Sequence, residues 1–264
     1  MAPTKNGLDE LTQFAKEIIR HSGKEALLYY GKGNPDSKFD EGLITEAEIH
    51  LTELFQNQLH AQFPEHQIFN NNQGNKDYTH EDKRYLWIHD ALDGAANFQA
   101  GIPTWGISLA LLENFWPIFG IFYMPATGDL FYAYAGKKAF HGENKICVST
   151  QESINNESLL LTFSRFHNYY HSTFPGKIRD FGCTSAHICY VAAGRAEAAI
   201  IANETYQNLV AAQIVVEAAG GKIIKMDGNV FFLNEYLEEQ KIDDHLLVIS
   251  PEMFSQIRGY LNKK

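Results

Sequence analysis

The first sixty residues show the spacing of apolar positions that is typical of two amphipathic helices. Residues 8–30 carry an apolar stripe at helical spacing, and the glycines and proline within 31–35 indicate where that helix ends. Residues 45–62 predict a second helix, because Thr45 and Glu48 form an N-terminal capping pattern. The stripes consist of Leu8, Leu11, Phe14, Ala15, Ile18 and Ile19 in the first helix, and Leu51, Leu54, Phe55 and Leu59 in the second.

The middle of the chain has the pattern of strands separated by short turns. Residues 70–84 are polar and typical of a loop. The apolar segments after this loop are rich in β-forming residues, with turn signals at Glu113, Asn114, Gly136 and Gly142. The predicted strands are 85–89, 104–112, 117–124, 129–135 and 145–149.

The second half alternates strands with helices. Helices are predicted at 183–194 and 207–219, each closed by glycine, and a last helix begins near Pro251. Mixed sheets alternating with helices favour an α+β or layered α/β class. We expect one domain over residues 1–264, with approximate halves 1–150 and 151–264. The predicted strands of the second half are 158–163, 196–202, 222–226 and 246–249.

Two aspartates follow the predicted strand 85–89 at a spacing that suits a metal site. Asp90 ends the strand, Asp93 lies three residues later, and Gly94 allows a sharp turn before a helix. Two carboxylates so placed can reach one pair of hard cations, and the helix amides that follow can bind an anion. Aspartate and glycine are also common turn residues, so the spacing alone favours an ordinary turn.

The surrounding segments resemble the inositol monophosphatase family over most of the chain and in the same order. The segment 86–98 resembles the family motif D-P-I-D-G-T-T-N-F, and residues 217–221 match its closing E-x-A-G-G. Further matches are Leu43 to Glu48 with V-T-x-A-D, Phe63 to His66 with F-P-x-H, Gly101 to Pro103, Ser108, Gly120, Tyr123 to Pro125, Gly136 to Phe140, Val148-Ser149, Gly182, Ser185-Ala186 and Ala192 to Gly194. The resemblance implies a layered α-β-α-β-α sandwich, Mg²⁺-dependent phosphatase activity and a homodimer.

Carried over residue by residue, the resemblance implies a degenerate metal site. Asp90, Asp93 and the backbone carbonyl of Leu92 match family ligands. Two other ligand positions, which are carboxylates in the family, fall on Asn72 and Asn208. Asparagine offers a neutral oxygen and cannot offset a cation's charge, so Mg²⁺ binding is expected to be weak or absent. A shift of one or two residues near position 72 would bring Asp77, Glu81 or Asp82 into play.

The resemblance also places altered residues where the family activates water and binds substrate. Glu48 replaces an aspartate, and a ~1 Å displacement of a catalytic group costs ~100-fold in rate. Ala95 and Ala96 follow Gly94 at the phosphate-binding turn in place of two threonines, which removes a hydroxyl that helps orient water. A substrate-contacting glutamate falls on Ile201, which cannot bond a sugar-like hydroxyl.

Composition and charge limit the classes of binding partner and the cellular setting that we expect. The formal net charge of -10 argues against sequence-independent nucleic-acid binding, although a bound metal would still allow an anionic substrate. No segment approaches the ~20 apolar residues of a membrane span, and the N-terminus lacks a signal-peptide pattern. The three cysteines have no framework spacing, so we expect a reduced, cytoplasmic setting.

Three hypotheses follow for function. The favoured one is a catalytically impaired member of the family that binds a phosphorylated small molecule or a protein partner. The alternative is a working metal-dependent phosphomonoesterase acting on inositol monophosphate or a related sugar or nucleotide phosphate. A third is a protein-interaction factor whose pocket is irrelevant.

Overall fold

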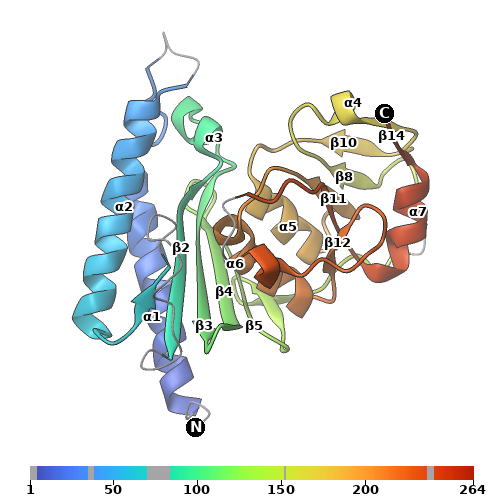
Figure 1. The fold of residues 1–264 in the computed structure, drawn as a ribbon. Helices are drawn as coiled ribbons and strands as arrows, with labels where there is room; N and C mark the ends of the chain where they lie inside the picture. The colour runs from blue at the N-terminus through green and yellow to red at the C-terminus, as the bar shows by residue number, and fades with distance from the viewer. Residues whose placement is uncertain (1–4, 35–38, 70–83, 152, 237–240) are drawn as a thin grey trace.

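Five layers of secondary structure make up the molecule (Figure 1). The computed structural model describes residues 5–34, 39–69, 84–151, 153–236 and 241–264. From one side to the other lie a helix pair, a seven-stranded sheet, a second helix pair, a five-stranded sheet and short outer helices. The predicted α-β-α-β-α sandwich is therefore confirmed.

The first layer contains α1 (Lys5–Ala26) and α2 (Glu41–Gln62), which correspond to the two predicted amphipathic helices. The predicted start of α2 at Thr45 was wrong. Asp40 is the N-cap, and its Oδ1 accepts a hydrogen bond from the Leu43 amide at 3.0 Å. Hydrogen bonds from backbone amides, chiefly that of Leu43, lower the pKa of Asp40 because they favour its charged form. Thr45 instead lies inside the first turns of the helix.

The second layer is a sheet in which the strands follow sequence order. The first two strands run parallel, and each later neighbour is antiparallel. From the third strand onward, short turns join the neighbours, which is typical of antiparallel pairs. The strands are β1 (Gln67–Ile68), β2 (Tyr85–Asp93), β3 (Gly106–Glu113), β4 (Trp116–Met124), β5 (Asp129–Tyr134), β6 (Ala139–His141) and β7 (Asn144–Ile146).

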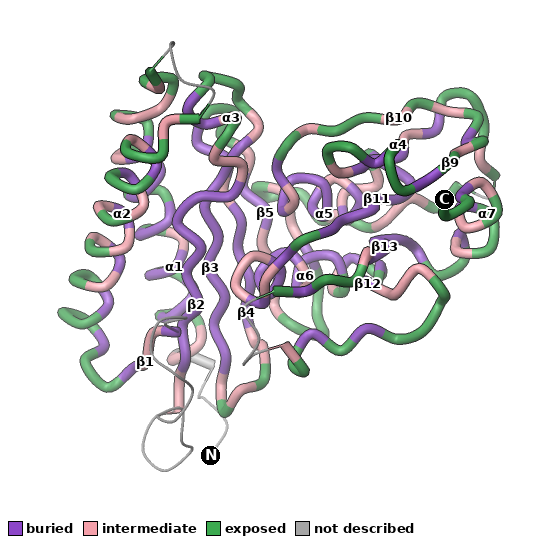
Figure 2. The backbone as a smooth tube through the Cα atoms, turned by 45° about the horizontal axis from the view of Figure 1, so that its top comes forward, coloured by how far each residue is buried: buried purple, intermediate pink, exposed green. Residues whose placement is uncertain are grey.

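Helices cover both faces of this sheet, which explains its nearly continuous apolar strands. Trp87 of β2 packs in the core formed with α1 and α2. Its neighbours Leu86 and Ile88 pack on the other face, against α5 (Thr184–Ala192) and α6 (Tyr206–Ala218). Successive strand residues point to opposite faces, so a sheet covered on both sides has apolar residues at every position. Figure 2 shows β2 and β3 as largely buried, whereas α2 alternates between buried and exposed residues.

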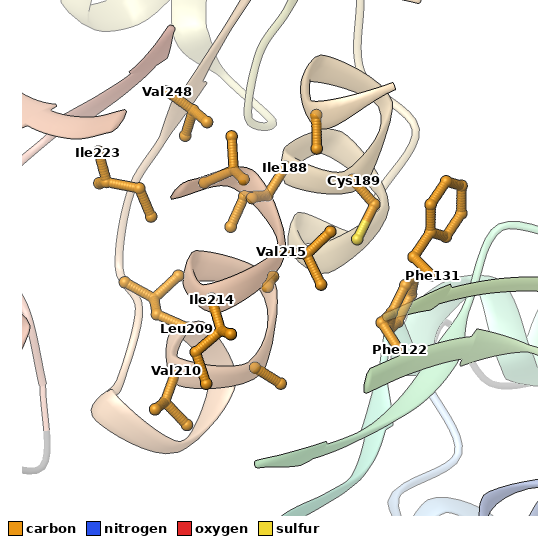
Figure 3. Packing of buried hydrophobic residues seen from close by; sticks show 14 of the residues in the cluster. Phe122, Phe131, Ile188, Cys189, Leu209, Val210, Ile214, Val215, Ile223 and Val248 are labelled. Carbon is orange, nitrogen blue, oxygen red and sulfur yellow. The ribbon is translucent and has the colours of Figure 1, made fainter. Parts of the chain in front are cut away.

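The helix pair α5 and α6 fills the space between the two large sheets (Figure 3). Val215 of α6 and Cys189 of α5 lie in this core near Phe122 and Phe131 of the first sheet. The second sheet has the order β10-β8-β11-β13-β12. Its strands are β8 (Leu159–Leu161), β10 (Lys177–Arg179), β11 (Ala198–Ile201), β12 (Lys222–Lys225) and β13 (Leu246–Ile249).

The outer layer consists of short elements. The predicted last helix near Pro251 is confirmed there, whereas the other elements were not predicted. The pair β9 (Tyr170–Ser172) and β14 (Leu261–Lys263) joins segments about ninety residues apart, and such pairing leaves no local sequence signal. Beside it lie α4 (Phe166–Tyr169), η2 (Pro251–Met253) and α7 (Phe254–Gly259), whereas η1 (Leu233–Tyr236) packs against α6. In the part of the chain that the structure describes, no helix is both long and apolar enough to cross a membrane.

Candidate functional site

A bulge at the end of β2 brings the two aspartates of the motif to one face of the sheet. Asp90 pairs with Ser108 of β3 and Asp93 pairs with Gly106, so three steps on β2 oppose two on β3. Without the extra residue, positions 90 and 93 would point to opposite faces. With it, both carboxylates follow Ile88 and point toward α5 and α6.

The two carboxylates differ in how their oxygens are satisfied. Asp93 accepts hydrogen bonds from the amides of Thr184 and Ser185 at the start of α5, at 3.3 and 2.6 Å. Asp90 accepts a long bond of 3.4 Å from the Leu92 amide through Oδ1. The buried Oδ2 of Asp90 has no hydrogen-bond partner among the described residues. An orphaned buried oxygen is costly, so it indicates a place for a ligand.

Negative charge accumulates around Asp90. Burial, together with the charges of Asp93, Glu204 and Glu48, raises the pKa of Asp90 to about 8. Burial and the charge of Asp93 likewise raise the pKa of Glu204 to about 7. Within the described part of the chain, the charged groups that shift these two pKa values are all carboxylates. A cation or bound protons must therefore compensate the cluster.

The other predicted residues of this region lie at the turn into α3 (Ala95–Ala100). Gly94 has φ +86°, and an added Cβ would lie 3.0 Å from the Thr104 carbonyl oxygen, so the turn requires glycine. Ala95 and Ala96 open the helix, and no side chain caps its first turn. Glu48 of α2 is half-buried, which raises its pKa, and its charge contributes to the raised pKa of Asp90.

Asn97 fixes this turn against the second half of the chain. Its Nδ2 donates to the carbonyl oxygens of Thr104 and Phe181, at 2.7 and 2.6 Å. Gly182, at φ +68°, makes room for it, because an added Cβ would lie 2.8 Å from Nδ2. Asn97 therefore holds α3 next to the start of α5, where Asp93 is bound.

Two of the altered positions lie on the second half of the chain, and one lies outside the described residues. Asn208 is in the first turn of α6, where its Oδ1 accepts from the Thr205 hydroxyl at 2.8 Å. Ile201, at the end of β11, is 1% exposed and packs in the core shared with α6. Asn72, like Asp77, Glu81 and Asp82, lies outside the described residues.

Glu204 is the carboxylate that sequence reasoning missed. It is 8% exposed, precedes the N-cap Thr205 of α6, and accepts a hydrogen bond of 2.5 Å from the Thr184 hydroxyl. Its position next to a helix start, four residues before Asn208, is a signal that could have pointed to it. The tertiary structure brings it to Asp93, which bonds the backbone of the same Thr184.

The donor set suits Mg²⁺ in chemistry, since carboxylate and carbonyl oxygens are the ligands that hard cations prefer. Asp90 and Asp93 and the carbonyl of Leu92 would hold it. Among the described residues, no group of three or more His, Cys, Asp or Glu side chains has metal-holding geometry. Mg²⁺ commonly keeps several waters and binds through one or two carboxylates plus substrate phosphates, so a site of this kind remains suitable.

A separate pocket of about 800 Å³ lies on the far side of α6 from the carboxylates. Val210 and Ile214 of α6 line it together with Trp116, Phe231 and Phe254. None of Asp90, Asp93, Glu204 and Glu48 contributes to it. Its lining is mostly apolar, which does not match phosphate chemistry, so the carboxylate cluster is the stronger candidate.

Comparison with known proteins identifies relatives and a solved structure that match most of the chain. A 25% identical relative, "Fructose-1,6-bisphosphatase/inositol-1-monophosphatase" of Thermotoga maritima, covers 93% of this chain and 98% of its own. A histidinol-phosphatase of Chlorobaculum parvum is 29% identical over 79% of this chain and 83% of its own. The extragenic suppressor protein suhB from Bartonella henselae has the same fold, with TM-score 0.74 at 20% identity over 95% of this chain and 97% of that one. The model of the inositol monophosphatase family matches residues 7–251, and the chain belongs to that family.

Proposed function

We propose that this chain is a metal-dependent phosphomonoesterase acting on an inositol monophosphate or a related sugar or nucleotide phosphate. The observation that supports this most is the buried, unpartnered Oδ2 of Asp90 within a group of carboxylates. Such a group favours a divalent cation, and the family and its named relatives favour phosphate monoesters as substrates.

The expectation of an impaired enzyme has no support in these comparisons. Both relatives described above carry the names of phosphatases. The argument for impairment counted the charges lost at positions 72 and 208 together with the changes at Glu48, Ala95 and Ile201. Glu204 adds a carboxylate that this count of charges left out. The working phosphomonoesterase is therefore the better-supported hypothesis.

In this proposal, Mg²⁺ bound by Asp90, Asp93 and the Leu92 carbonyl would offset phosphate charge and favour attack by water. The amides after Gly94 face no capping side chain and would bind phosphate oxygens at Ala95 and Ala96. Glu48 keeps a carboxylate for orienting water, although Ala95 supplies no hydroxyl to assist it. We expect turnover to be slow for this reason.

The test is phosphate release from inositol 1-phosphate, fructose 1,6-bisphosphate, histidinol phosphate and AMP, with Mg²⁺ or with EDTA. We expect Mg²⁺-dependent release from at least one of them. Asp90→Asn should lower that rate by about 100-fold or more, as when a group that stabilises transition-state charge is removed. The control Asp243→Asn changes an exposed carboxylate and should leave the rate unchanged. No release from any substrate, or an unchanged rate in Asp90→Asn, would contradict the proposal.

The family resemblance also leads us to propose a homodimer. Light scattering on the eluate of a sizing column gives the mass directly. A mass near 60 kDa, twice the 29.9 kDa of one chain, is expected, and a mass near 30 kDa would contradict it.

A further inference from the structure

Glu204 is held in place by its backbone as well as by its side chain. Its carbonyl oxygen accepts a hydrogen bond of 2.7 Å from the Ile242 amide, in an isolated bridge beside the second sheet. Its side chain is buried at the start of α6, where it faces α5. A carboxylate fixed in this way has little freedom to turn toward water.

One residue ties Glu204 to the aspartates of β2. Thr184 donates its hydroxyl to Glu204 Oε1 at 2.5 Å and its amide to Asp93 Oδ1 at 3.3 Å. The two carboxylates therefore flank the first residue of α5, and burial together with the charge of Asp93 raises the pKa of Glu204. Asp90, whose Oδ2 is unpartnered and buried, feels the charge of both.

The side chain of Asn208 contacts the Glu204 carboxylate directly. The Asn208 Nδ2 lies 3.5 Å from Glu204 Oε2 and donates to it, one helical turn away. An aspartate at 208, which the family resemblance leads one to expect, would place a second carboxylate against Glu204 without a donor between them. Glutamate at 204 thus favours a neutral residue at 208, so the two positions act as a pair.

We propose that Glu204 supplies negative charge next to a divalent-cation site held by Asp90 and Asp93, in place of residue 208, without itself binding the cation. This inference rests on the proposed metal-dependent function only in requiring that a cation binds. The neutral Asn208 then does not imply a loss of negative charge from the cation site, because Glu204, one helical turn earlier, carries that charge. Charge compensation of the cation is then met by three carboxylates of the described chain.

Calorimetric titration of the full-length protein with Mn²⁺ tests this without an activity assay. Glu204→Gln keeps the shape of the side chain and one of its two acceptor oxygens, but removes the charge. We expect its Mn²⁺ affinity to fall by about 10–100-fold, the loss seen when groups that support metal ligands are removed. The matched control is Glu217→Gln, which changes an exposed carboxylate on the same helix and should leave the affinity unchanged.

The double variant Glu204→Gln with Asn208→Asp separates a charge effect from general damage to the site. It returns the carboxylate to position 208, so we expect it to recover most of the affinity lost in Glu204→Gln. Thermal unfolding of each variant in EDTA checks the fold. Glu204→Gln should unfold no earlier than the original chain, because a buried negative charge has been removed.

Unchanged Mn²⁺ affinity in Glu204→Gln would overturn the inference, as would the absence of Mn²⁺ binding to the original chain. Failure to recover affinity in the double variant would also overturn the pairing of 204 with 208. Failure of the proposed function looks different. In that case Mn²⁺ binding would depend on Glu204, while none of the phosphate esters would be hydrolysed.

Discussion

The two ends of β2 bury opposite kinds of side chain. Tyr85 to His89 pair with β3 in unbroken register, and Leu86, Trp87 and Ile88 fill the cores on both faces. Directly after His89, the strand bulges between Asp90 and Asp93 and buries both carboxylates. The first end stabilises the fold, whereas the second end costs stability by burying like charges. A strand anchored at one end can hold an unfavourable arrangement at the other.

The largest effect is expected from Trp87→Ala at the apolar end. Trp87 is fully buried, packs edge-on to Phe14, and donates its Nε1 hydrogen to His66 Nδ1 at 2.9 Å. Truncation should lower the free energy of unfolding by about 3–5 kcal/mol. Urea unfolding measures this. Trp116→Ala is the control, since Trp116 is 71% exposed and its loss should cost no more than about 0.5 kcal/mol.

Gly94→Ala changes the turn after the charged end of β2 and should lower the free energy of unfolding by about 1–3 kcal/mol. The alanine would have to adopt a left-handed backbone, and its Cβ would lie close to the Thr104 carbonyl oxygen. Gly128→Ala has a similar φ of +78° but no atom within 4 Å of the new Cβ. The difference between the two variants therefore measures the steric part. Equal losses in both would show that the turn at Gly94 is not tightly packed.

Thr205→Ala should have a smaller effect on stability, at the start of α6 next to the charged end of β2. Thr205 caps α6 by accepting from the Asn208 amide, and its hydroxyl also donates to Asn208 Oδ1. Loss of an N-cap costs about 1 kcal/mol, measured as a shift in the urea midpoint. Thr205→Ser keeps the oxygen and should be nearly neutral. If serine were as damaging as alanine, the methyl group rather than the cap would be responsible.

The smallest effect is expected in the pH dependence of stability that arises from His66, the hydrogen-bond partner of Trp87 at the apolar end of β2. Burial lowers the pKa of His66 below its usual 6.5, while the charge of Glu65 opposes this in part. The unfolded chain then takes up a proton more readily than the folded chain, so stability is lost as pH falls below about 6.5. Urea unfolding at pH 7.5, 6.5 and 5.5 should show a weaker dependence in His66→Gln. Identical slopes would contradict this prediction.

The order of the main helices and strands could be predicted from local patterns, because each must present apolar residues to a core. The start of α2 could not, since Thr45 and Glu48 imitate a capping pattern while Asp40 supplies the actual cap. Likewise, β9 and β14 pair across about ninety residues, and neither is apolar enough to be recognised alone. A local sequence pattern indicates which residues are buried, but it does not indicate which distant strands pair.

For the site, the sequence by itself determined that Asp90 and Asp93 end a buried strand before a glycine turn, and that residue 208 is neutral. Only the tertiary structure placed both aspartates on one face, because that depends on the register between β2 and β3. Only it brought Glu204 to them, through Thr184 at the start of α5. Spacing along a chain fixes which groups are near in sequence, whereas charge compensation in a buried site depends on which groups are near in space.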